Sequence, residues 1–159
     1  MTIHRLVISC AMSALPLVVF APIHNARAQQ NSYACKEAEP ATLCAAANTC
    51  SGSCSVDVKR TSDGASATPG FPGAKGNSIF CAKVGTKVIW KSDTKHQGFI
   101  VDMGPRSPFS SQDIIGGSDR SVAVVAKTAG CYRYSVGACL SGEMYGMCGN
   151  SAAELVILK

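Results

Sequence analysis

From Cys54 onward, apolar and β-branched residues alternate with polar ones in short runs, and Gly, Pro, Ser and Asp separate the runs. A period of two is typical of β-strands that bury one face, so each run predicts a strand. The predicted strands span residues 56–58, 78–84, 86–91, 98–101, 121–126, 131–136 and 155–158. Gly85 predicts a tight turn between two of these strands. The Gly and Pro residues within 61–77 predict a long loop.

This pattern predicts an all-β domain, because only one segment favours a helix. That segment, residues 42–48, lies in an Ala-rich stretch, 29–55, and Pro40 and a Ser-Gly-Ser turn bound it. Several short strands in a chain of this length predict an antiparallel β-sandwich over residues 56–159. Residues 29–55 are too short to bury much surface alone. We therefore expect disulfides within this extension, or from it to the sandwich, to hold it in place.

Residues 1–28 have the organisation of a cleavable secretory signal peptide. Arg5 precedes an uncharged apolar run over 6–23, and the small residues Ala26 and Ala28 suit a signal-peptidase site. Two prolines interrupt the apolar run, which makes it a poor membrane anchor. We expect a periplasmic or secreted protein with no stable membrane anchor after cleavage. What remains of the 159 residues is enough for one domain.

Cysteine use supports export, because eight of the nine cysteines follow the signal peptide. These are Cys35, Cys44, Cys50, Cys54, Cys81, Cys131, Cys139 and Cys148. An even set in a small exported domain predicts a disulfide framework, although many pairings are open. One candidate joins Cys81 to Cys131 across the sandwich, and another joins Cys139 to Cys148. A zinc or iron–sulfur cluster is the alternative, but the spacing from Cys50 to Cys54 has no second matching pair.

Charge and motifs exclude several classes of function. The net charge of +5 falls by two when the signal is removed, which is too mild to indicate nucleic-acid binding. The sequence contains no phosphate-binding Gly loop, nucleophile elbow or zinc-protease helix. His96 is the single histidine after the signal, and no Ser-His-Asp triad can be argued around it. We therefore expect a protein that is not an enzyme.

Several segments occur in the order typical of one family of copper proteins. Residues 84–90 read V-G-T-K-V-I-W, residues 96–102 read H-Q-G-F-I-V-D, residues 108–111 read P-F-S-S, and residues 130–134 read G-C-Y-R-Y. In these segments the chain resembles the cupredoxins, which include plastocyanins and amicyanins. The resemblance covers residues 78–159 and implies a Greek-key β-sandwich.

The resemblance also implies that the type 1 copper site of the family is incomplete. That site uses two imidazoles, a thiolate and a weak axial Met. His96 matches the first family histidine. Aligned on residues 132–135, the family pattern places Val136 at the thiolate position, Cys139 at the second histidine and Met144 at the axial Met. Two of the four ligands are therefore missing.

Three hypotheses of function follow. The first is a binding or accessory module with an unidentified protein partner and no required cofactor. The second is copper binding or electron transfer by an atypical set, His96, Met144 and Met147, with Cys139 if its thiol is free, because nitrogen and sulfur ligands suit Cu(I). The third is a redox protein that uses Cys139 or Cys148 as a reactive thiol. Two structural alternatives compete with these: ordinary packing of the methionine loop, and a Cys139–Cys148 disulfide that removes the thiolate.

Overall fold

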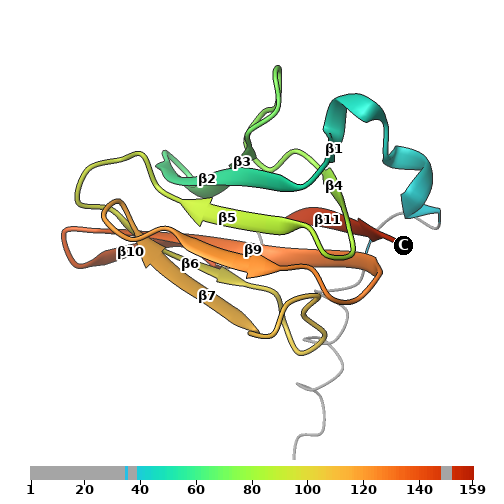
Figure 1. Cartoon of the computed structure of the whole chain (residues 1–159). Coiled ribbons are helices and arrows are strands. Elements are labelled where there is room, and N and C mark those ends of the chain that lie inside the picture. The colour runs from blue at the N-terminus through green and yellow to red at the C-terminus, as the bar shows by residue number, and fades with distance from the viewer. Residues whose placement is uncertain (1–34, 36–38, 148–151) are drawn as a thin grey trace, which may run out of the picture.

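Two β-sheets packed face to face make up the protein in a computed structural model that describes residues 35, 39–147 and 152–159 (Figure 1). The smaller sheet has four strands in the order β3-β2-β5-β8. Its strands are β2 Ser53–Thr61, β3 Gly64–Pro69, β5 Lys87–Lys91 and β8 Val122–Val125. This arrangement confirms an all-β, sandwich-like fold.

The larger sheet has seven strands and carries the residues of interest for function. Its order is β1-β4-β11-β9-β6-β7, and β10 pairs with β9 beside that path. Its strands are β1 Thr49–Cys50, β4 Phe80–Lys83, β6 Gly98–Asp102, β7 Asp113–Gly117, β9 Gly130–Leu140, β10 Glu143–Gly146 and β11 Ala152–Leu158. Two 3₁₀ turns, η1 Pro40–Leu43 and η2 Ala46–Asn48, precede β1 in place of the helix predicted over 42–48. They lie at the end of the sandwich opposite to β10 (Figure 1).

Aromatic side chains from both sheets form the centre of the core. Trp90 on β5 packs edge-on against Phe80 on β4 and Tyr134 on β9, with ring centroids 6.3 and 5.4 Å apart. All three side chains are completely buried. Alternation along β9 places Tyr134, Val136 and Ala138 in the core and leaves the residues between them on the outer face of the larger sheet.

The predicted antiparallel pairing is only partly correct, because both sheets are mixed. Strand β2 runs parallel to β5, and β4 runs parallel to both β1 and β11. Residues 61–77 were expected to form a loop, and this is wrong for 64–69, which form β3, the hairpin partner of β2. Its sequence, GASATP, has the small residues of a loop, yet five of the six are buried in the sheet.

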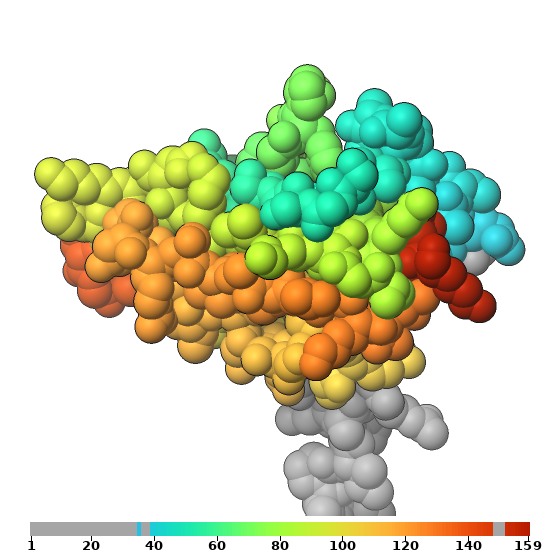
Figure 2. All heavy atoms as spheres, viewed as in Figure 1, coloured from blue at the N-terminus to red at the C-terminus, as the bar shows by residue number. Residues whose placement is uncertain are grey.

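Three disulfides among the described residues confirm the predicted framework in part, and two of them join the extension to the sandwich. Cys44 bonds to Cys81, Cys35 bonds to Cys131, and Cys50 bonds to Cys54. Figure 2 shows residues 39–48, in cyan, packed beside the carboxyl-terminal strand in red. Disulfides of this kind fit an oxidising compartment. The predicted signal peptide, 1–28, lies outside the described residues. Within them, no helix is both long enough and apolar enough to cross a membrane.

The predicted bridge from Cys81 to Cys131 is wrong. Both residues belong to the larger sheet, and both lie opposite Val156 on β11, one on each side of it. Two strand spacings separate them by about 10 Å, whereas the Cα atoms of a disulfide are at most about 7 Å apart. Each cysteine instead reaches outward to the extension.

Replacing Tyr134 with Phe should stabilise the protein by about 1 kcal/mol. The Tyr134 hydroxyl is buried without a hydrogen-bond partner among the described residues, and burial raises the pKa of its phenol. Such a hydroxyl costs about 1–3 kcal/mol of stability. Urea unfolding with the disulfides intact would measure the change. Tyr132→Phe is the control, and it should be destabilising because the Tyr132 hydroxyl donates to the Thr128 carbonyl at 3.0 Å. A loss of stability in Tyr134→Phe would contradict the prediction.

Candidate functional site

Strands β9 and β10 form a hairpin that brings two sulfur-containing side chains together. Ser141 and Gly142 form its two-residue turn, and both have left-handed backbone, with φ of 54° and 85°. Two such residues are typical of a type I′ turn, whose twist suits a hairpin. The register places Met144 directly opposite Cys139. Directly opposed residues share a face of the sheet, with Cβ atoms about 5 Å apart. Both therefore lie on the outer face of the larger sheet.

Met147 brings a third sulfur to the same place, because Gly137 on β9 leaves room for it. At the point where a Cβ on Gly137 would stand, the nearest atoms are Met147 Cγ at 2.6 Å, Met144 Sδ at 3.0 Å and Ile100 Cγ2 at 3.1 Å. The two methionines therefore converge above Gly137, two residues from Cys139 on the same face. We call Cys139, Met144 and Met147 the sulfur cluster.

The backbone of Met147 is held in an unusual conformation. Its φ is 73°, and its amide donates to the Val136 carbonyl at 2.9 Å. A non-glycine residue in the left-handed region costs free energy and is often found at functional sites. His96, the other candidate with such a backbone, has a φ of 60°.

The sulfur cluster rests on apolar surface and is open to solvent. Ile100 on β6 pairs with Ile115 on β7 and, on its other side, with Gly137. The exposed fractions of Met144 and Ile115 are 56% and 55%, which are high for large apolar side chains. Cys139 is half-buried and forms no disulfide with any described cysteine. A soft-metal ion could reach all three residues from outside, and apolar neighbours would shield it on the inner side.

His96 lies at the same end of the sheet, two residues before Gly98, which pairs with Cys139. Its amide donates to Ser118 Oγ at 3.1 Å, and its side chain is exposed. Together with Gly117 and Arg120, His96 lines an open hollow of about 1060 Å³. The structure thus brings Cys139, Met144 and Met147 together, whereas His96 lies on the turn before β6 and lines a hollow that none of these three residues borders. In Figure 2 this turn, in yellow-green, lies at the same end of the molecule as the hairpin.

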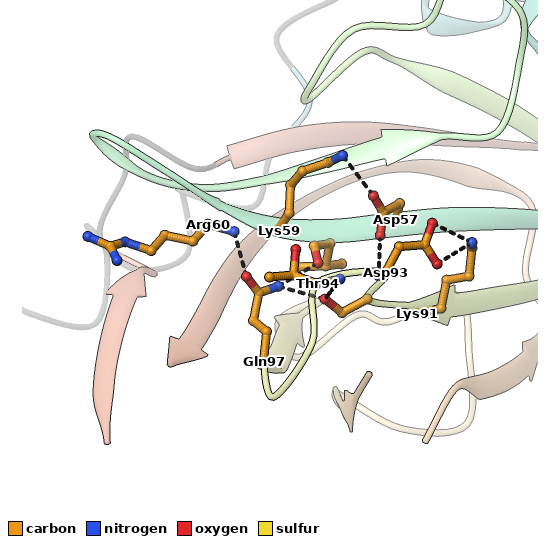
Figure 3. A network of polar contacts seen from close by, with 9 residues as sticks. Asp57, Lys59, Arg60, Lys91, Asp93, Thr94 and Gln97 are labelled. Atoms are coloured by element: carbon orange, nitrogen blue, oxygen red, sulfur yellow. Dashed lines mark hydrogen bonds and ion pairs between the residues drawn. The ribbon is translucent and has the colours of Figure 1, made fainter. Parts of the chain in front are cut away.

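Gln97 anchors the turn that carries His96. Its side chain is 1% exposed, and Nε2 donates to the Val58 carbonyl at 2.8 Å and to Ser92 Oγ at 2.7 Å. Its Oε1 accepts from the Arg60 amide at 3.0 Å (Figure 3). Because Val58 and Arg60 belong to β2, this one amide group ties the turn before β6 to the smaller sheet. Sequence reasoning missed Gln97, since a polar residue before a strand is ordinary on a surface.

Charged residues around Gln97 hold the same turn from the solvent side. Asp57 accepts from the Asp93 amide at 3.0 Å and pairs with Lys59 at 3.0 Å. Lys91 donates to both carboxylate oxygens of Asp93, at 2.6 and 2.8 Å, and this contact raises the pKa of Lys91 (Figure 3). The turn is therefore fixed at both ends, by Gln97 inside and by Asp93 outside.

The residues aligned with the type 1 copper ligands do not share one location. Val136, at the thiolate position, is completely buried in the core, whereas Cys139 and Met144 are on the opposite, outer face of the sheet. Within the described residues, no three His, Cys, Asp or Glu side chains gather closely enough to hold an ion. Cys148, and with it the predicted Cys139–Cys148 disulfide, lies outside the described residues.

No protein-family model matches this chain, and no curated protein matches it either.

Proposed function

We propose that this chain is an exported, non-enzymatic, cupredoxin-like protein that lacks a type 1 copper centre and binds Cu(I) through the sulfur cluster. The convergence of Met144 and Met147 above Gly137, beside Cys139, carries this proposal. Thiolate and thioether ligands select Cu(I) over harder ions such as Mg²⁺ and Ca²⁺. An exposed cluster suits a protein that takes up and passes on an ion.

The positions of the segments that resemble cupredoxins support the cupredoxin-like part of the proposal. Trp90, which ends the 84–90 segment, lies in the core, and Tyr134, which ends the 130–134 segment, packs against it. The segment that starts with His96 leads into β6, which pairs with β9. Two packed sheets with these neighbours support a relationship to the Greek-key sandwiches of that family.

Anaerobic Cu(I) titration of the mature, disulfide-intact protein against a chromophoric Cu(I) chelator tests the proposal. We expect one Cu(I) per chain, with sulfur ligands in the copper X-ray absorption spectrum. Met144→Leu and Met147→Leu keep the side-chain volume and remove one thioether each. Each should weaken binding about tenfold, which corresponds to about 1.4 kcal/mol.

Met103→Leu is the matched control, because Met103 is 2% exposed and belongs to the core cluster. It should leave Cu(I) affinity unchanged. Wild-type protein that binds no Cu(I) would overturn the proposal in favour of a metal-free binding module. Wild-type affinity in both Met144→Leu and Met147→Leu would exclude the sulfur cluster as the site. Intense blue absorption after loading with Cu(II) would show that a type 1 centre forms after all.

A further inference from the structure

Tyr145, the neighbour of Met144 on β10, points away from the sulfur cluster. It lies opposite Ala138, a completely buried core residue of β9, so it occupies an inward-facing position at the end of the sandwich. The Arg60 guanidinium lies over its ring, with Cζ 3.9 Å from the ring centroid. Since Arg60 belongs to β2, this cation–π contact joins the hairpin to the smaller sheet.

Both partners of this contact are held by further hydrogen bonds. The Tyr145 hydroxyl donates to the Glu143 carboxylate. The Arg60 amide donates to Gln97 Oε1, while its guanidinium points away from that group (Figure 3). A chain of contacts therefore runs from the His96 turn through Gln97 and Arg60 to Tyr145.

The hairpin needs such support. Strand β10 has four residues, and β9 is its single partner strand among the described residues. A short hairpin without further packing is marginally stable. Methionine has three rotatable bonds, so its side chain loses entropy when the thioether binds an ion. The total loss is larger when the backbone that carries it must also become ordered. Contacts that fix β10 from the inner face would reduce this loss without blocking the outer face.

We propose that Arg60 and Tyr145 are positioning residues, which act as a latch that fixes β10 so that Met144 and Met147 are ready to bind a metal ion. The expected effect of this latch on Cu(I) affinity rests on the proposed function. The ordering of β10 is a property of the metal-free protein and can be measured separately.

The first test measures hydrogen exchange of the Met147 amide in the metal-free protein, since this amide bonds to the Val136 carbonyl. Tyr145→Leu and Arg60→Leu should speed its exchange about tenfold, because opening the hairpin exposes it. Tyr145→Phe and Arg60→Lys keep an aromatic ring and a cation, and both should stay close to wild type. Unchanged exchange in Tyr145→Leu would overturn the latch whatever the protein binds.

The second test measures Cu(I) affinity and the number of sulfur ligands in the same variants. Tyr145→Leu and Arg60→Leu should bind about tenfold more weakly, with fewer sulfur ligands, and Arg60→Lys should restore both properties. The two Leu changes should not add in the double variant, because they break one contact. A lower melting temperature with wild-type affinity would show a merely structural contact and overturn the latch. If the wild type binds no Cu(I) while exchange responds as expected, the proposed function fails and the latch stands as an ordering device.

Discussion

Replacing Cys44 and Cys81 together with Ala should lower the free energy of unfolding by about 4 kcal/mol. The two cysteines are 37 residues apart in sequence, and a crosslink over such a loop removes much entropy from the unfolded chain. Cys81 is completely buried on β4, so the bond also holds η1 and η2 against the outer face of the larger sheet. Urea unfolding of the oxidised variant and the wild type would give the difference.

The matched control replaces Cys50 and Cys54, which are only four residues apart. The same loop-entropy relation gives about 2 kcal/mol for this bond. We therefore expect the Cys44–Cys81 variant to be the less stable of the two. A reductant breaks both bonds, so it should also lower the free energy of unfolding of the wild type. If the shorter bond contributed more than the longer one, local packing rather than loop closure would be the source of stability.

Strand positions were predictable where the side chains alternate strongly. Strand β5, with the sequence KVIWK, and β11, with AAELVIL, lie close to the predicted segments, because large apolar residues mark their buried faces. Strands β3, β7 and β10 were missed. Their sequences, GASATP, DIIGG and EMYG, are rich in small residues or too short to show a period. The parallel strand pairs were missed as well, since alternation is the same in parallel and antiparallel pairs.

The number of disulfides could be anticipated better than their partners. An even set of cysteines indicates pairing, but pairing depends on which strands are neighbours. Cys81 and Cys131 both lie beside Val156, and this register is set by β11, far along the chain. The extension bonds to both cysteines on the outer face of the larger sheet, and nothing in the sequence of 29–55 predicts that it lies on that face.

The candidate ligands were identifiable by type, whereas their arrangement was not. Cys139, Met144 and Met147 are soft donors close together in sequence, which is enough to name them. Their convergence depends on Gly137, whose missing side chain makes room for two thioethers. The Ser141-Gly142 dipeptide could have predicted the hairpin, since Ser-Gly is frequent in turns. With that hairpin, Cys139 and Met144 fall on one face.

Gln97→Met should lower the free energy of unfolding by about 3 kcal/mol. Methionine has nearly the shape of glutamine, so the change removes hydrogen bonds without leaving a cavity. It removes the partner of the Val58 carbonyl and of the Arg60 amide, whereas Ser92 Oγ keeps the hydrogen bond that it accepts from the Thr94 amide at 3.3 Å. Each buried polar group that loses its partner costs about 1–3 kcal/mol. Two such groups give about 3 kcal/mol when each costs about 1.5 kcal/mol.

Asp93→Asn is the control on the same turn. The Asp93 side chain is 65% exposed, and its ion pair with Lys91 should contribute less than about 1 kcal/mol. Urea unfolding would compare the two variants with the wild type. Because Gln97 adjoins His96 and holds the Arg60 amide, Gln97→Met should also speed exchange of the Met147 amide in the folded protein, and Asp93→Asn should not. Equal stability losses in the two variants would mean that the turn is held mainly from its solvent side. The buried amide would then have no special role in joining the two sheets at the sulfur cluster.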